Sequence, residues 1–278
     1  MKGQKIIKFG DLNMKKLLNL ILVGLVVTFP VAHSAVTKEA SEGVLTLSYS
    51  DGSSKTVGVA EVNKILRKVG VRVSQVPIPE EAKAILEVSK KRAISKDESE
   101  QLISLFSLHR GELLEQIKKA GRTPEAHRGG FLSTSEAGVS PYPKVYDMNA
   151  MSPQIEQYLQ EKFGKLHVNS SENGQGIDEV MTIVSGGDWT WFFTLPNDVV
   201  GKLTLGYVSS EGDAWRISYP GLVPHGGYLD APYGLVVAYA HGPENFVMRY
   251  EEPSIQGTNT LGGNPWIDLT GDIPKLLD

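Results

Sequence analysis

Between residues 166 and 250 the sequence consists of short extended runs that are separated by turn signals. The runs cover residues 166–169, 179–185, 190–195, 202–208, 214–219, 235–240 and 245–250. Glycine-, proline- or aspartate-rich steps separate them, among them Gly186-Gly187, Pro196-Asn197 and Gly242-Pro243. Seven short strands at this spacing predict an antiparallel β-sandwich or barrel, and a jelly roll is one arrangement that would fit.

The preceding region, residues 35–122, mixes both periodicities. Strand-like runs at 44–50 and 55–59 flank Asp51-Gly52, which is a hairpin signal. Apolar residues spaced as in a helix over 62–69 and alternation over 71–76 complete a predicted ββαβ unit. The chain as a whole is therefore predicted to be α+β.

Two helices should follow this unit. Pro79 begins the first, which should run to about Arg92. Ser95 and Glu98 form a capping-box pattern that begins the second, and Gly121 ends it. Gly111 would kink or split that helix, and the pair is predicted to form a helical hairpin that covers the sheet.

These patterns divide the chain into predicted segments. Residues 123–151 are rich in glycine, serine and proline and predict a linker or long loop. Ser152-Pro153 predicts the start of a helix at the head of a β-rich domain over residues 152–252. Residues 253–278 predict an irregular tail that lies along the surface.

The N-terminus carries the pattern of an export signal. Lys15 and Lys16 follow Met14, an apolar run covers 17–29, and small residues surround Ser34. This order predicts a signal peptide over residues 1–34, cleaved near Ser34, with residues 1–13 as an upstream extension. An uncleaved anchor is the alternative. We therefore expect export to the periplasm or the medium, without stable membrane insertion after cleavage.

Composition excludes several classes of protein. The chain has no cysteine, which rules out disulfides, thiolate metal ligands and a cysteine nucleophile. Residues 36–130 carry 16 basic and 13 acidic side chains, whereas residues 131–278 carry 7 and 18. The acidic second half should repel nucleic acid. No serine-hydrolase elbow and no nucleotide-binding glycine motif is present in the sequence.

Histidines at strand ends are the candidate metal ligands. His225 and His241 stand beside glycines, with Asp230 between them in the sequence and Glu244 shortly after as the alternative carboxylate. Together they predict a two-histidine, one-carboxylate site for Fe(II), Mn(II) or Zn(II), to which His167 could add a ligand. The alternative is that His225 and His241 only bond loop carbonyls. Acidic pairs such as Asp178-Glu179 are interpreted as solvated charges at turns or strand ends.

An aromatic cluster offers a second candidate site. Alternation places Trp189, Trp191 and Phe193 on one face of a strand. On an inner face they would form core, and on an outer face they would be a stacking platform for a flat ligand. With Tyr228, the two tryptophans are the predicted ligand-binding residues.

The β-rich half is similar in architecture to a cupin jelly roll. The cupin metal motif requires two histidines separated by one residue, then a glutamate and a later histidine, and that pattern is absent. The comparison therefore concerns architecture only.

Three functions remain open. The first hypothesis is an exported protein whose β domain binds a small molecule or a divalent metal. The second is a metal-dependent oxygenase, isomerase or hydrolase that uses the same residues. The third is an envelope interaction or scaffold protein whose contact surface is the helical region 79–122. The oligomeric state is left open.

Overall fold

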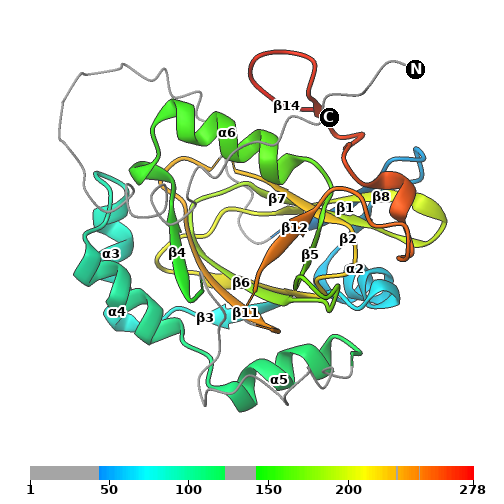
Figure 1. Ribbon diagram of the computed structural model, residues 1–278. Helices are drawn as coiled ribbons and strands as arrows, with labels where there is room; N and C mark the ends of the chain where they lie inside the picture. Colours follow the sequence, from blue (N-terminus) through cyan, green and yellow to red (C-terminus); the bar gives the residue numbers. More distant parts are fainter. Residues whose placement is uncertain (1–43, 123–141, 230, 244) are drawn as a thin grey trace. The chain divides into compact units, whose positions relative to one another are not determined.

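Two antiparallel five-stranded sheets dominate the computed structural model, which describes residues 44–122 and 142–278 except 230 and 244 (Figure 1). The predicted signal peptide over 1–34 and most of the predicted linker lie outside these residues. In the described ranges no helix combines the length and the hydropathy that a membrane crossing requires.

Each sheet keeps a fixed strand order. The first sheet runs β10 (His225–Tyr228), β7 (Trp189–Thr194), β8 (Val200–Leu205), β1 (Leu45–Tyr49) and β2 (Thr56–Val57). The second runs β3 (Arg72–Pro77), β9 (Asp213–Tyr219), β6 (Asp178–Ser185), β11 (Leu235–His241) and β4 (Lys144–Asp147). The mixed α and β composition, with most strands in the C-terminal part, is as the sequence predicted.

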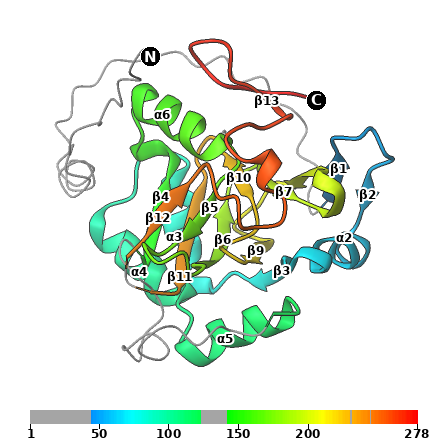
Figure 2. The same ribbon diagram turned by 45° about the vertical axis from the view of Figure 1, so that its right-hand side comes forward.

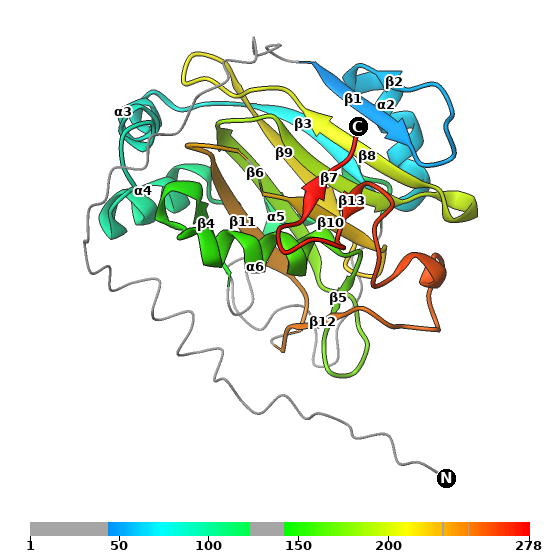
Figure 3. The same ribbon diagram turned by 90° about the horizontal axis from the view of Figure 1, so that it is seen from above.

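The main core lies between the two sheets, which Figure 3 shows from above. Side chains of both sheets meet there, for example Leu203 and Trp191 of the first and Ile183 and Ile217 of the second. Alternation along each strand sends every second residue inward. The arrangement is a β-sandwich, as predicted, while jelly-roll connectivity stays a prediction.

The N-terminal strands belong to both sheets. β1 pairs with β8, and β3 pairs with β9. Helix α2 (Val59–Leu66) connects β2 to β3 and buries Val62 in the common core. The predicted order ββαβ is present, but its third strand is in the other sheet. Pairing with the C-terminal strands satisfies backbone groups that a separate unit would leave exposed, so the two predicted regions share one core within residues 40–278.

Three helices cover the outer face of the second sheet (Figure 1). They are α3 (Glu80–Ser89), α4 (Lys96–Phe106) and α5 (Arg110–Lys119). The capping box of Ser95 and Glu98 is confirmed at the start of α4. The predicted second helix is split before Gly111, because the N–H of His109 donates to Glu112 at 2.8 Å and begins α5. A role of this helical layer as a contact surface stays a prediction.

The remaining elements close the sandwich. Helix α6 (Pro153–Gly164), capped by Ser152 as predicted, packs beside β10. The C-terminal segment crosses the outer face of the first sheet (Figure 2), where Ile267 packs with Phe192 and Tyr228. The short elements are β5 (Val168–Ser170), β12 (Val247–Arg249), β13 (Ile267–Asp268), β14 (Lys275–Leu276) and the 3-10 turns η1 (Arg67–Val69), η2 (Met148–Ala150), η3 (Pro196–Asp198) and η4 (Thr258–Thr260).

A candidate metal site in the sandwich interior

Two histidines face each other at one end of the interior. His167 precedes β5, and His225 begins β10, and the two residues form an antiparallel bridge. Each backbone N–H donates to the other's carbonyl at 2.9 Å. Directly opposed residues project to the same side of the ladder, and the two ring centroids lie 4.7 Å apart. The pairing brings together two of the histidines that the sequence singled out.

Backbone carbonyls fix the orientation of both imidazole rings. His167 Nδ1 lies 2.8 Å from the carbonyl of Lys165, and His225 Nδ1 lies 2.7 Å from that of Val223. A carbonyl oxygen can only accept, so Nδ1 carries the proton in each ring. Burial, followed by the neighbouring His225, holds the pKa of His167 well below its usual range. The neutral ring therefore keeps a lone pair on Nε2, the form in which histidine binds metals.

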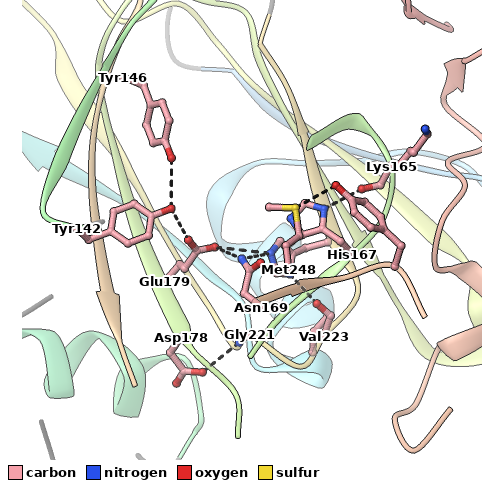
Figure 4. Close-up of polar contacts among 12 residues, drawn as sticks. Tyr142, Tyr146, Lys165, His167, Asn169, Asp178, Glu179, Gly221, Val223 and Met248 are labelled. Carbon is pink, nitrogen blue, oxygen red and sulfur yellow. Dashed lines mark hydrogen bonds and ion pairs between the residues drawn. The ribbon is translucent and has the colours of Figure 1, made fainter. Parts of the chain in front are cut away.

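A buried carboxylate lies beside the histidine pair. Glu179 shares the inward face of β6 with Met181 and Ile183 and is 2% exposed. Its Oε1 accepts from the hydroxyl of Tyr142 at 2.8 Å (Figure 4). The expectation of a solvated charge at this position is wrong. Alternation turns Glu179 into the core, and hydrogen bonds compensate for the water that it loses there.

Three tyrosines surround this carboxylate. Burial, followed by the charge of Glu179, raises the pKa of both Tyr142 and Tyr219 well above the usual value. Burial also raises the pKa of Tyr146 to about 12, and its hydroxyl lies 3.3 Å from that of Tyr142. All three phenols therefore keep their protons at neutral pH. Tyr142 donates a hydrogen bond to Glu179, and Tyr219 lies close enough for the charge of Glu179 to raise its pKa.

Asn169 connects the carboxylate to the histidine pair. Its Nδ2 donates to Glu179 Oε2 at 2.7 Å (Figure 4). The same nitrogen lies 3.0 Å from His225 Nε2. His225 Nε2 and Glu179 Oε2 are 3.6 Å apart. We call this group the polar cluster; it consists of Tyr142, Tyr146, His167, Asn169, Glu179, Tyr219 and His225. Both nitrogen and oxygen donors for a metal are thus gathered in one buried place.

The predicted aromatic site is divided between two faces. Trp189 and Trp191 point into the core between the sheets, being 0% and 6% exposed. They are therefore core and not an outer stacking platform. Trp191 belongs to the same buried core as Tyr219, which is a member of the polar cluster. Tyr228 lies on the outer face of the first sheet, where its hydroxyl donates to the carbonyl of Pro274 at 2.8 Å.

His241 is separated from His225 by the second sheet. It stands opposite Asp178 in the register of β11 and β6, on the face that the helices cover. Its neighbour Ala240 stands opposite Glu179 and faces the interior. The predicted pairing of His225 with His241 is therefore not formed, because strand parity sends the two side chains to opposite faces. Asp230 lies outside the described residues.

A cleft of about 400 Å³ lies on the side where His241 is found. Arg67, Lys68 and Arg122 contribute positive charge to its lining, and Asp178 contributes negative charge. Arg122 and Asp178 form an ion pair at 2.5 Å. Asp178 also accepts from the N–H of Gly221 at 3.2 Å. The cleft thus borders the turn that leads to His225.

The polar cluster has the nitrogen and oxygen donors of a metal site, but these donors are not close enough together to surround a metal ion. Among the described residues, no three side chains of histidine, aspartate or glutamate converge closely enough to hold a metal ion. The amide of Asn169 stands between His225 and Glu179. A metal could be enclosed only if this amide moved and the donors closed in.

Sequence reasoning found the two histidines but missed Asn169, Glu179 and the tyrosines. A usable signal for Glu179 was present, because it shares the parity of Met181 and Ile183 in a strand that is otherwise apolar. Asn169 shares the parity of His167 in the same way. No sequence signal indicated Tyr142, which comes at the end of a long irregular stretch.

Comparisons with known proteins add little to the site. No family model matches the chain, and no curated protein matches it. Among solved structures, acireductone dioxygenase from Bacillus anthracis, with a cadmium ion in its active centre, aligns with a TM-score of 0.49 at 17% identity. The alignment covers 76% of this chain and 100% of that chain. A likeness of this size carries no inference about chemistry.

Proposed function

We propose that the chain is a metal-dependent enzyme acting on a small molecule, with one divalent metal bound by His167, His225 and Glu179. The observation that carries the proposal is the pair of buried histidines whose Nδ1 atoms both donate to backbone carbonyls. Metal-binding histidines characteristically have such a partner on the second ring nitrogen, because it fixes the tautomer and aims the other nitrogen at the metal.

The donor set indicates which metals would bind. Two imidazoles and one carboxylate suit Fe(II), Mn(II) or Zn(II), and three protein ligands leave positions open for a substrate. A metal in such a site would act as a Lewis acid and position the substrate. Lys165 and Val223 would hold the two rings through their carbonyls, while Tyr142 would hold the carboxylate of Glu179.

Energetics also favour a functional role for the cluster. Replacing a buried network of charged groups by well-packed apolar side chains of similar volume often leaves the stability of a protein unchanged or increases it. Polar groups that are buried although they do not increase stability are candidates for a functional site.

We also propose that the chain is exported, on the basis of residues 14–35, which lie outside the described residues.

Metal titration tests the proposal. Chelator-treated protein should bind one Mn(II), Zn(II) or Co(II) per chain, measured by calorimetry with elemental analysis. Glu179→Gln should weaken binding by more than about tenfold. Glu251→Gln makes the same change at an exposed carboxylate outside the cluster and should leave affinity unchanged. Absence of binding, or equal affinity of both variants, would contradict the site.

A second measurement separates an enzyme site from a closed structural site. Azide added to Co(II)-loaded protein should change the visible absorption spectrum, because an open coordination position accepts an external ligand. A spectrum that azide leaves unchanged at saturating concentration would indicate a closed site and contradict the enzymatic role.

A further inference from the structure

The side chain of Asn169 is the part of the polar cluster whose hydrogen bonding is incomplete. Its Nδ2 contacts both Glu179 and His225. Its Oδ1 is buried and has no hydrogen-bond partner. A buried acceptor without a donor is rare and requires an explanation, of which a bound ion is one.

The backbone of Asn169 is held on both sides, so only its side chain is free to adjust. The N–H donates to Gly221 at 2.8 Å, and the carbonyl accepts from Ile177 at 2.9 Å. A Cβ atom at Gly221 would lie 2.3 Å from that carbonyl oxygen, which shows how closely the segments pack. Rotation of the side-chain amide would leave these backbone contacts in place.

Rotation would exchange a donor for an acceptor at the centre of the cluster. The two ends of a side-chain amide are nearly equal in size, so a half-turn places oxygen where nitrogen was. Oδ1 would then face Glu179 Oε2 and His225 Nε2, which are 3.6 Å apart. Three lone pairs directed at one place repel one another unless a cation lies between them.

We propose that Asn169 is a further metal ligand, which binds through Oδ1 after its amide rotates. Without metal, its Nδ2 hydrogen-bonds to the two acceptors and occupies the space between them. This inference rests on the proposed metal site and adds a ligand to it. The donors would still have to close in around the metal, because the rotated Oδ1 takes the place of Nδ2 between Glu179 and His225. Six-coordinate metals such as Fe(II) and Mn(II) would still keep a position for substrate.

Two substitutions at this position separate a ligand from a structural residue. Asn169→Asp supplies an anionic oxygen without rotation, so we expect Mn(II) affinity to rise at least tenfold. The same variant should be less stable without metal, because its carboxylate faces that of Glu179. Asn169→Ala should lower Mn(II) affinity about tenfold, within the range known for changes beside a metal. If Asn169 were only structural, both variants would change Mn(II) affinity in the same direction, or neither would change it. Either result would overturn the inference.

Asn264 provides the matched control. It is also buried, and its Nδ2 donates to Gly164 at 2.8 Å, outside the polar cluster. Asn264→Asp should therefore leave Mn(II) affinity within twofold of the unchanged chain. A gain in affinity as large as that of Asn169→Asp would overturn the inference.

A measurement on the unchanged chain covers the case in which the variants do not fold. In protein with ¹⁵N-labelled asparagine, Zn(II) should shift one side-chain amide signal strongly, because that amide loses two acceptors. Asparagine signals that Zn(II) leaves unchanged, in a chain that does bind it, would overturn the role of Asn169 while the proposed function stands. If neither Mn(II) nor Zn(II) binds the unchanged chain, both proposals fail.

Discussion

The two ends of the sandwich interior differ although the same strands build them. On β9, Trp215 and Ile217 point into an apolar core, and the next inward residue is Tyr219. On β6, Ile183 is likewise apolar, whereas Glu179 carries a buried carboxylate. The apolar end is stabilised by burial of surface, and the polar end depends on every group finding a partner. The two ends are therefore stabilised in different ways, and the proposed metal site lies at the polar end.

The largest effect is expected at the apolar end. Ile183→Ala should reduce the free energy of unfolding by about 2–5 kcal/mol, because it leaves a cavity between the sheets. Denaturant unfolding measures the loss, and Mn(II) titration of the folded variant should show unchanged affinity. A large loss of Mn(II) affinity would show that the two ends do not act separately.

Removal of a histidine at the polar end should mainly lower Mn(II) affinity. His225→Ala should lower Mn(II) affinity by at least about a hundredfold, or ~2.7 kcal/mol. Loss of a residue that only holds a ligand in place costs up to about a hundredfold, so loss of the ligand itself should cost at least as much. Calorimetric titration measures this change. If the variant bound Mn(II) like the unchanged chain, His225 would not be a ligand.

Acid should weaken the polar end through His167. Its pKa is lowered in the folded protein, so the unfolded chain binds the proton more readily. Stability should therefore be complete above about pH 6.5 and fall by up to about 1.4 kcal/mol per pH unit below it. Unfolding measured at pH 7.5, 6.5 and 5.5 should show a shallower slope for His167→Phe. Equal slopes for both proteins would contradict the buried neutral state.

The smallest effect is expected for the histidine on the other face. His241→Gln should leave Mn(II) affinity within about twofold, because strand parity places this side chain on the helix-covered side of β11. The same titration provides the measurement. A loss similar to that of His225→Ala would mean that the two histidines share a site after all.

The fold was predictable where one face of a strand differed from the other or where turn residues marked its ends. Most predicted strand runs are present, with bounds that shift by a few residues. The strand β10 was missed because Gly226-Gly227 is typical of a turn. Gly226 is required within the strand because the backbone of α6 lies close by, and a Cβ at this position would come within 2.8 Å of the Phe163 carbonyl. Such a constraint comes from tertiary packing and is invisible locally.

The site was predictable only in part, because it depends on long-range pairing. His167 and His225 were both selected, but their direct opposition joins segments that are far apart in the sequence. His241 was paired with His225 wrongly, since all residues of β11 are buried and the apolar pattern does not reveal which face is which. Glu179 was interpreted as a solvated charge because charged side chains at strand ends are usually exposed to water.

The most direct test of the account is X-ray absorption at the metal edge of the purified, Mn(II)- or Zn(II)-loaded chain. We predict one metal per chain with two imidazole nitrogens and oxygen donors at about 2.0–2.2 Å in the zinc form. In His225→Ala one imidazole should disappear, whereas His241→Gln should keep both. A spectrum without imidazole ligands, or one that only His241→Gln changes, would contradict a metal site at the polar end of the sandwich.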